Sequence, residues 1–338
     1  MFGHLPWSRL ATLPTPLERG PRLPGGARLW LKRDDLTGLG MGGNKARKLE
    51  FLVGAAVADG ARSLVTVGAA QSNHCRMTAA AGALLGLEVH LVLSGDRPAV
   101  PAGNQILSAL FGAQMHYTGA HDSHWGELEI AREALADELT AGGAAPYSIP
   151  IGGSTAVGAL GYASAFFELM EQCRARDVHP AAIVVTSSSG GTHAGLVAGK
   201  ALWRERHGPT LGSGGGPLPE VLAIGVAKGV NVGSPDIAAL ARETIGLVGQ
   251  PGTVEPGDVQ LDTRWLGDDY AVPTAAGDAA VRWAARHGGW VLDRTYTGKG
   301  FAGLVANAEA DRWPSGGDVI FIHTGGTPAV FAPGGVPL

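Results

Sequence analysis

Residues 63–93, SLVTVGAAQSNHCRMTAAAGALLGLEVHLVL, contain a complete strand–helix–strand unit. The apolar run 63–67 predicts a buried strand, residues 73–85 predict a helix, and residues 89–93 predict a second strand. Strands joined through a helix lie parallel in one sheet. The loop 68–74 therefore follows the carboxyl end of the first strand, at the edge where ligands bind to such sheets.

The same alternation of short apolar runs and helical stretches continues along the chain. Further strands are expected at residues 114–117, 147–150, 182–186, 221–226, 290–292 and 319–323. Further helices are expected at residues 104–111, 125–140, 156–172, 192–206, 236–247, 275–287 and 300–310. The glycine-rich stretch 212–217 reads as a flexible surface loop. The pattern predicts an α/β protein of mostly parallel, twisted sheets flanked by helices.

Composition excludes several classes of function. The chain has 338 residues and a formal net charge of -4, and it shows no lysine or arginine run, so nucleic-acid binding is not expected. No apolar stretch is long enough to cross a bilayer, and residues 1–15 lack the apolar core of a secretory signal. A cytoplasmic protein with a large core, divided into two lobes, is therefore expected.

Metal and thiol chemistry are also not predicted. Cys75 and Cys173 are far apart and have no metal-binding spacing, and Cys75 is better read as a small buried apolar residue. His121 and His124 could hold a metal as a pair, but no carboxylate or third imidazole stands at ligand spacing. A surface cluster at a helix start explains the two histidines better.

Residues 41–50, MGGNKARKLE, place a lysine at the mouth of a helix. With Asn44 as the N-cap, Lys45 falls in the first turn, where the positive end of the helix dipole disfavours an ammonium. A lysine that is more often neutral is a better nucleophile towards an aldehyde. The alternative is an ordinary basic helix start with Arg47 and Lys48, and this segment alone leaves both interpretations open.

Two further loops carry polar groups between a strand and a helix. Residues 186–195, TSSSGGTHAG, could hold a phosphate monoester with backbone N–H groups, hydroxyls and a helix N-terminus. The stretch matches neither a P-loop nor a dinucleotide fingerprint, and a plain loop is the alternative. In the loop 68–74, Gln71, Ser72 and Asn73 could hold a carboxylate or a phenolic oxygen, although Ser72 or Asn73 could also simply cap the helix.

Together, a lysine, a phosphate loop and a polar cleft loop indicate pyridoxal 5'-phosphate. The chain resembles the D-cysteine desulfhydrase and 1-aminocyclopropane-1-carboxylate deaminase family, which has the tryptophan-synthase-β-like fold of pyridoxal-phosphate enzymes of fold type II. The matching stretches run nearly end to end and keep the order of the family. They are residues 15–17, 31–35, 42–45, 71–74, 150–154, 191–195, 296–299 and 323–326.

The resemblance implies a role for each matching position. Lys45 would form the Schiff base with the cofactor and then act as the base that moves the α-proton of the substrate. The other cofactor contacts would come from Asn73 at the 3'-oxygen, the backbone of Ser189, Gly190, Gly191 and Thr192 at the phosphate, Tyr296 over the pyridine ring and Thr324 near the ring nitrogen. The substrate would contact Gln71, Ser72, Asn73 and Tyr270. The expected catalytic residues are Lys45, Ser72, Tyr270 and Tyr296. Contacts of Lys48 or His193 with the cofactor stay open.

One position separates the activities of this family. Members that open the cyclopropane ring resemble one another in carrying a glutamate after the tyrosine that corresponds to Tyr296, whereas this chain has Thr297. A neutral residue there gives a weaker electron sink, which suits rapid loss of a good β-leaving group such as thiolate. The resemblance therefore implies β-elimination from D-cysteine, which gives pyruvate, sulfide and ammonia.

Departures from the family pattern keep other substrates open. Arg294 and Thr295 replace the usual Pro-Val, and the glycine neighbours usual around the second tyrosine are missing at residues 269–271. L-Cysteate, β-chloroalanine and 1-aminocyclopropane-1-carboxylate are the alternative substrates. A non-catalytic protein that binds an amino acid is the alternative class, although Lys45 and Tyr296 argue against it.

The resemblance also implies an architecture. Residues 1–47 and 155–338 would form the larger, cofactor-binding lobe, and residues 48–154 would form a smaller inserted lobe. The cofactor would lie between the lobes, and a homodimer is expected.

Overall fold

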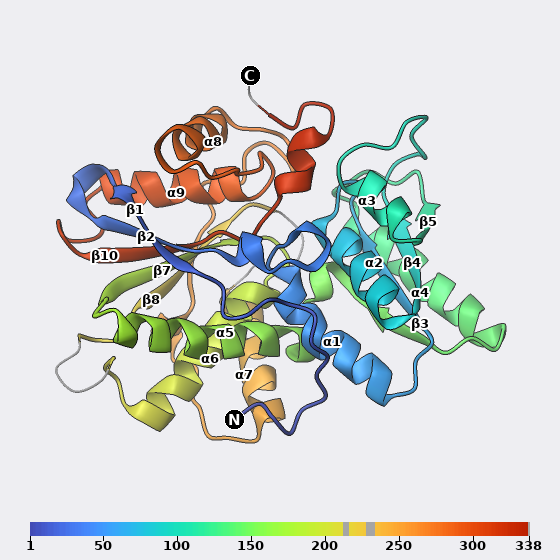
Figure 1. Ribbon diagram of the computed structural model, residues 1–338, viewed down its shortest axis with the longest axis horizontal. Helices are drawn as coiled ribbons and strands as arrows, with labels where there is room; N and C mark the ends of the chain where they lie inside the picture. The colour runs from blue at the N-terminus through green and yellow to red at the C-terminus, as the bar shows by residue number, and fades with distance from the viewer. Residues whose placement is uncertain (212–215, 228–233, 337–338) are drawn as a thin grey trace.

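The computed structural model describes residues 1–211, 216–227 and 234–336, and their strands form two sheets (Figure 1). The six-stranded sheet has the order β1 (Leu17–Arg22), β2 (Arg28–Lys32), β10 (Asp318–Ile322), β7 (Pro180–Ser187), β8 (Glu220–Gly225) and β9 (Gln260–Asp262). The four-stranded sheet has the order β5 (Gln114–Tyr117), β4 (Glu88–Leu93), β3 (Ser63–Gly68) and β6 (Pro146–Ile149). All of these pairings are parallel except that of β1 with β2.

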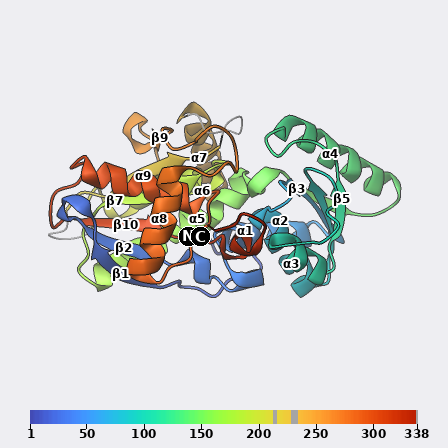
Figure 2. The same cartoon turned by 90° about the horizontal axis from the view of Figure 1, so that it is seen from above.

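Helices cover both faces of each sheet (Figures 1 and 2). The smaller sheet has α2 (Asn73–Leu85) and α3 (Asn104–Leu110) on one face and α4 (Trp125–Ala141) on the other. The larger sheet has α8 (Ala275–Gly288) and α9 (Thr297–Glu309) on one face, and α5 (Ala156–Ala175), α6 (Gly191–His207) and α7 (Ser234–Val248) on the other. Helix α1 (Lys45–Ala58) packs on α5 and joins the two halves. Short 3-10 turns are η1 (Pro24–Gly26), η2 (Asp34–Leu36), η3 (Leu39–Met41), η4 (Ile151–Gly153), η5 (Pro256–Asp258) and η6 (Thr327–Phe331).

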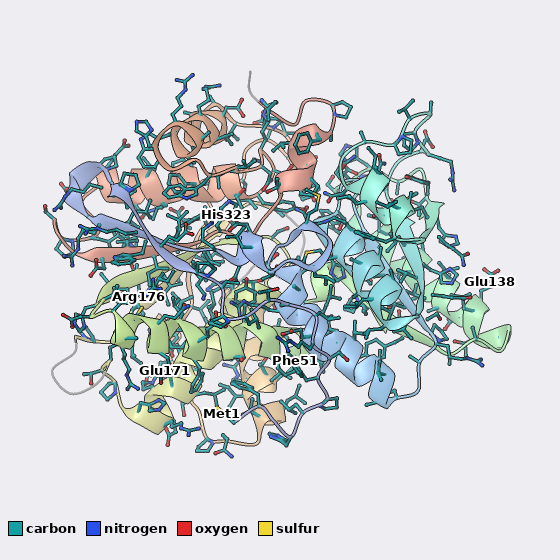
Figure 3. The ribbon with its side chains drawn as sticks, in the orientation of Figure 1. Met1, Phe51, Glu138, Glu171, Arg176 and His323 are labelled. Carbon is teal, nitrogen blue, oxygen red and sulfur yellow. The ribbon has the colours of Figure 1, made fainter. Side chains whose placement is uncertain are left out.

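The central strand β7 shows why the larger sheet is buried on both faces. Ile183 and Val185 belong to the core shared with α5 and α6, whereas Ala182 and Val184 belong to the core shared with α8 and α9. Because side chains alternate along a strand, a strand covered on both sides is apolar at every position. Polar side chains such as Glu138 and Glu171 lie on the outer surface, while His323, just after β10, is buried (Figure 3).

Most predicted elements are confirmed, with small differences at their ends. The predicted strand at residues 290–292 is wrong, because Trp290 and Leu292 bury their side chains in the core under α8 and α9 without joining a sheet. Strands β1, β2 and β9 were not predicted, and α9 begins at Thr297, three residues before the predicted start. Of the predicted surface loop 212–217, residues 212–215 lie outside the described part of the chain.

Among the described residues, we find no helix with the length and apolar character needed to span a bilayer.

Candidate active site

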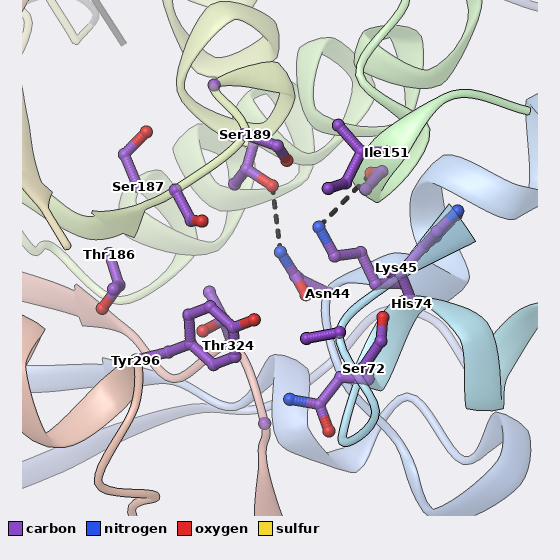
Figure 4. A pocket seen from close by; sticks show the side chains of 18 of the residues that line it. Asn44, Lys45, Ser72, His74, Ile151, Thr186, Ser187, Ser189, Tyr296 and Thr324 are labelled. Carbon is purple, nitrogen blue, oxygen red and sulfur yellow. Dashed lines mark hydrogen bonds between the residues drawn. The ribbon is translucent and has the colours of Figure 1, made fainter. Parts of the chain in front are cut away.

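A pocket of about 770 Å³, including the space open to solvent, lies at the carboxyl ends of β3, β7 and β10. Residues from both halves of the chain line it (Figure 4): Lys45, Ser72 and His74 enter from one side and Thr186, Ser187 and Ser189 from the other. This is the edge at which open parallel sheets bind ligands. The further lining residues include Asn44, Asn73, Trp125, Ile151, Gly152, Gly190, Thr192, Tyr270, Asp293, Tyr296 and Thr324.

Lys45 is the first residue of α1 and points its amine into this pocket (Figure 4). The Nζ atom donates to the carbonyl oxygen of Gly152 at 3.3 Å. Burial of the amine lowers the pKa of Lys45 to about 8, an effect that the nearby Cys75 opposes. The ammonium form of Lys45 is therefore disfavoured, as predicted, but the main cause is burial and not the helix dipole. The resulting amine is suited to attack an aldehyde.

Asn44 stands at the predicted N-cap position, but its side chain does not cap α1. Its backbone is already helical, and its side chain makes no capping hydrogen bond to α1. Instead, the Asn44 amide donates to the hydroxyl of Thr192 at 3.0 Å (Figure 4). The asparagine thus connects the lysine turn to the start of α6, on the other side of the pocket.

The predicted phosphate loop borders the pocket at the start of α6. Ser187, Ser188, Ser189, Gly190 and Thr192 line it, whereas Gly191 does not. Gly190 holds the N-cap position with φ of 82° and has no side chain of its own to cap α6. The N–H of Gly191, the first residue of α6, donates to Ser154 Oγ at 3.2 Å, and the positive amino end of the helix faces the pocket where an anion would lie.

Two hydroxyls at the start of this loop have no hydrogen-bond partner in the described part of the chain. Within the described part of the chain, Thr186 Oγ1 and Ser187 Oγ are buried and make no hydrogen bond. Buried hydroxyls are normally paired. Together with the amino end of α6, these two groups fit a phosphate-bearing ligand.

The loop between β3 and α2 serves two purposes. Ser72 caps α2 by accepting from the backbone N–H of Cys75 at 3.2 Å, and it also lines the pocket with Asn73. The Gln71 side chain is turned away, because it bonds Ala102 at 3.0 Å and accepts from the Asn104 N–H at 2.9 Å. A substrate contact through the Gln71 side chain thus stays a prediction without support from this geometry.

Two tyrosines close the pocket from the larger half of the molecule. The hydroxyls of Tyr270 and Tyr296 hydrogen-bond to each other, and burial raises the pKa of both phenols. Both tyrosines are therefore neutral hydrogen-bond donors at ordinary pH. Thr297 does not line the pocket, since its hydroxyl donates to Asp293 Oδ2 at 2.7 Å.

Sequence reasoning missed several lining residues. Asp293 lines the pocket and accepts the backbone N–H of Tyr296 at 2.6 Å. No role was predicted for Trp125, yet only 8% of this residue is exposed and it lines the pocket. His74 is buried with a lowered pKa, mainly because of desolvation, so it is neutral. The sequence signal that could have identified His74 as a pocket residue is its position directly after Asn73 in the loop.

The undecided residues have distinct positions. Lys48 is buried and donates to the carbonyl oxygen of Gly152 at 2.6 Å and to Ser154 Oγ at 3.1 Å. Its Nζ atom lies next to Gly191, at the start of α6. His193 is fully buried and does not line the pocket, and burial lowers its pKa to about 4. Lys48 is thus the better placed of the two to approach an anion at α6.

A family model described as pyridoxal-phosphate dependent enzyme matches residues 9–325. The chain belongs to this family. It is similar to a D-cysteine desulfhydrase of Salmonella typhi, with 39% identity over 338 residues that cover 97% of this chain and 96% of the relative. A solved structure of an ACC deaminase homologue has 36% identity and a TM-score of 0.85, covering 98% of this chain and 95% of that one. The processed form of threonine deaminase isoform 2 from Solanum lycopersicum has a TM-score of 0.63 at 16% identity, over 94% of this chain and 84% of that one, and supports the fold alone.

Membership in the pyridoxal-phosphate dependent enzyme family confirms the resemblance, the fold and the cofactor inferred from the sequence. The pocket fits this cofactor on its own evidence. It offers a lysine of lowered pKa for the aldehyde and the amino end of α6 for the phosphate, with two buried hydroxyls nearby that have no partner among the described residues.

Proposed function

We propose that this chain is a pyridoxal-phosphate dependent carbon–sulfur lyase that converts D-cysteine and water to pyruvate, hydrogen sulfide and ammonia. The observation that carries the proposal is Lys45, whose amine faces Gly152 with its pKa lowered to about 8 by burial. The full-length similarity to D-cysteine desulfhydrases supports the substrate.

The cofactor would be held by residues that line the pocket. Lys45 would carry it, the loop from Ser189 to Thr192 would hold its phosphate, and Asn73 would meet its 3'-oxygen. Tyr296 would lie over the pyridine ring and Thr324 near the ring nitrogen. When bound, the cofactor supplies an electron sink for the electrons of the Cα–H bond.

Lys45 would take the α-proton of the substrate. Roughly a tenth of such an amine is neutral at pH 7, against less than about one part in a thousand for an ordinary lysine. The hydrogen bond to Gly152 would hold Nζ in one orientation during this step.

The remaining groups would orient the substrate. Ser72 and Asn73, at the start of α2, would receive its carboxylate, with Gln71 contributing through its backbone. Tyr270 and Tyr296 are neutral, and the one that accepts in their mutual hydrogen bond would donate its own proton on the side where the β-substituent leaves. Thr297 supports elimination over opening of a cyclopropane ring, because its hydroxyl is bound to Asp293 and no carboxylate stands at its position.

The test is a direct assay of the purified holoenzyme. D-Cysteine should yield pyruvate and sulfide in equal amounts, and Lys45→Ala should lower the rate by at least about a thousandfold. Borohydride reduction followed by peptide mapping should locate the cofactor on Lys45.

The same assay separates the alternatives. L-Cysteate, β-chloroalanine and 1-aminocyclopropane-1-carboxylate should be poorer substrates than D-cysteine. A yellow protein that binds amino acids but releases nothing from any of these compounds would be a binding protein, and the lyase proposal would then fail.

We also propose the arrangement that the family resemblance implies: a cytoplasmic homodimer whose lobes are residues 1–47 with 155–338, and residues 48–154. The two separate sheets support the division into lobes. Sedimentation velocity of the holoenzyme tests the dimer, and native-state hydrogen exchange tests the lobes, because residues 48–154 should open as one unit apart from the rest.

A further inference from the structure

An aromatic wall built from both halves of the chain closes one side of the pocket. Trp125, the first residue of α4, meets Tyr270 with ring centroids 4.7 Å apart and an angle of 82° between the ring planes. Both rings line the pocket and both are more than nine-tenths buried. They belong to one apolar cluster with Val67 and Ala69 at the end of β3. Trp125 therefore lies beside the loop that contains Ser72, on the substrate side of the pocket.

The wall is fixed in place by bonds to its neighbours. One turn beyond Trp125, the Glu129 carboxylate accepts the backbone N–H of Ile151 at 2.7 Å. Ile151 precedes Gly152, whose carbonyl receives the Lys45 amine. On the other side, Ser123 Oγ donates to Asp269 Oδ2 at 3.3 Å, next to Tyr270. These bonds hold the start of α4 to both halves of the chain, and the indole itself packs against the Tyr270 ring.

We propose that Trp125 sets the size of the β-substituent that this site accepts, so that the natural substrates carry a small group such as a thiol. This inference rests on the proposed β-elimination. The proposed reaction is the same for any thioether: the Cβ–S bond breaks with both electrons on sulfur, which takes a proton. Substrate plus water gives a thiol, pyruvate and ammonia. Trp125→Ala should remove the indole from the wall and admit S-alkyl groups. In a hydrophobic pocket, one methylene group changes kcat/KM between two substrates by about tenfold or more.

A matched control exists on the same helix. Leu128 is fully buried in the same apolar cluster, one turn from Trp125, but it does not line the pocket. Leu128→Ala loosens the packing of α4 without opening the wall. Trp125→Phe keeps an aromatic ring and tests the proposal if the alanine variant does not fold.

The experiment measures kcat/KM for D-cysteine, S-methyl-D-cysteine and S-benzyl-D-cysteine on the holoenzymes, together with their affinities from the absorbance change of the bound cofactor. The kcat/KM for S-benzyl-D-cysteine, divided by that for D-cysteine, should rise at least about tenfold in Trp125→Ala. This ratio should rise less in Trp125→Phe and should not change in Leu128→Ala. Equal ratios in all proteins, or the same rise in Leu128→Ala, would overturn the proposal. If Trp125→Ala binds the S-benzyl compound more tightly relative to D-cysteine, but no compound yields pyruvate, the size limit set by Trp125 is supported and the proposed lyase function is wrong.

Discussion

Lys45 shares the carbonyl oxygen of Gly152 with a second lysine. Lys48 Nζ lies 2.6 Å from this oxygen and Lys45 Nζ lies 3.3 Å from it. One neutral oxygen cannot compensate two ammonium groups, and burial together with the charge of Lys45 lowers the pKa of Lys48 far below its usual value. The charged form of Lys48 is therefore disfavoured while Lys45 is protonated, and the two lysines compete for one acceptor.

The lowered pKa of Lys45 predicts how the cofactor enters the protein. The neutral fraction of an amine with a pKa of about 8 rises steeply from about pH 6 to about pH 8 and then levels off. Because only the neutral amine attacks an aldehyde, the rate of cofactor attachment to the cofactor-free protein should rise more than about tenfold over this range. Stopped-flow absorbance of the forming holoenzyme measures this rate. A pH-independent rate, or a rise that continues to about pH 10, would contradict the assignment.

At the scale of elements, the start of α9 depends on a single carboxylate. Asp293 is almost fully buried and accepts the backbone N–H groups of Thr295 at 2.9 Å, Tyr296 at 2.6 Å and Thr297 at 3.1 Å. These bonds satisfy groups that a helix start leaves without partners. They also fix the backbone from which Tyr296 reaches Tyr270.

Asp293→Ala should therefore weaken both the fold and the site. Loss of these bonds is expected to cost about 1–3 kcal/mol in the free energy of unfolding, and displacement of Tyr296 should raise the KM for D-cysteine. Urea denaturation and steady-state kinetics measure the two effects. Asp278→Ala is the matched control, because Asp278 pairs with Arg294 in the same segment but is partly exposed, and it should change either quantity little. An unchanged KM in Asp293→Ala would contradict the positioning role.

The elements that could be predicted are those whose signals are local. The unit at residues 63–93 was readable because a buried strand and a helix each leave their own spacing in the sequence. Residues 290–292 show the same apolar spacing but gain their burial from helices, so the pattern alone was misleading.

The residues of the site likewise fall into those that a local motif predicts and those that it does not. Lys45 and the loop from Ser189 to Thr192 stand in short motifs, whereas Tyr270 and Tyr296 could be assigned only through a family resemblance. Asp293 and Trp125 lie in segments with no such motif. Their roles follow from contacts between segments far apart in the chain, which no local spacing records.

At the scale of the whole molecule, a buried ionic cluster joins the N-terminal segment, α1 and α5. Arg47 bonds Asp34 at 2.9 Å and Glu168 at 2.8 Å, and Lys32 pairs with Glu168. Arg47 stands two residues after Lys45, so the cluster fixes the start of the helix that begins with Lys45. Removing one member of a buried pair leaves the other charge without a partner, which usually costs about 3–5 kcal/mol.

Arg47→Met should thus lower the free energy of unfolding by about 3–5 kcal/mol. Thermal and urea unfolding at neutral pH measure the change. Arg286→Met, on the exposed side of α8, is the control and should leave the free energy of unfolding unchanged. A loss below about 1 kcal/mol in Arg47→Met would mean that the cluster contributes little net stability.

The same cluster predicts how the protein responds to acid. Burial alone would raise the pKa values of Asp34 and Glu168, but their contacts with Arg47 and Lys32 bring both below the ordinary values of 3.8 and 4.5. Carboxyls with a lowered folded-state pKa stabilise the protein fully above those ordinary values and lose this contribution as the pH falls below them. The unfolding temperature should therefore fall steeply below about pH 4.5.

In Arg47→Met, Asp34 is still buried but has lost its guanidinium partner, so the pKa of Asp34 should rise. The fall of the unfolding temperature with decreasing pH should then flatten or reverse. Calorimetry of both proteins between about pH 3 and pH 7 measures the two slopes, and parallel slopes would contradict the role given to Arg47.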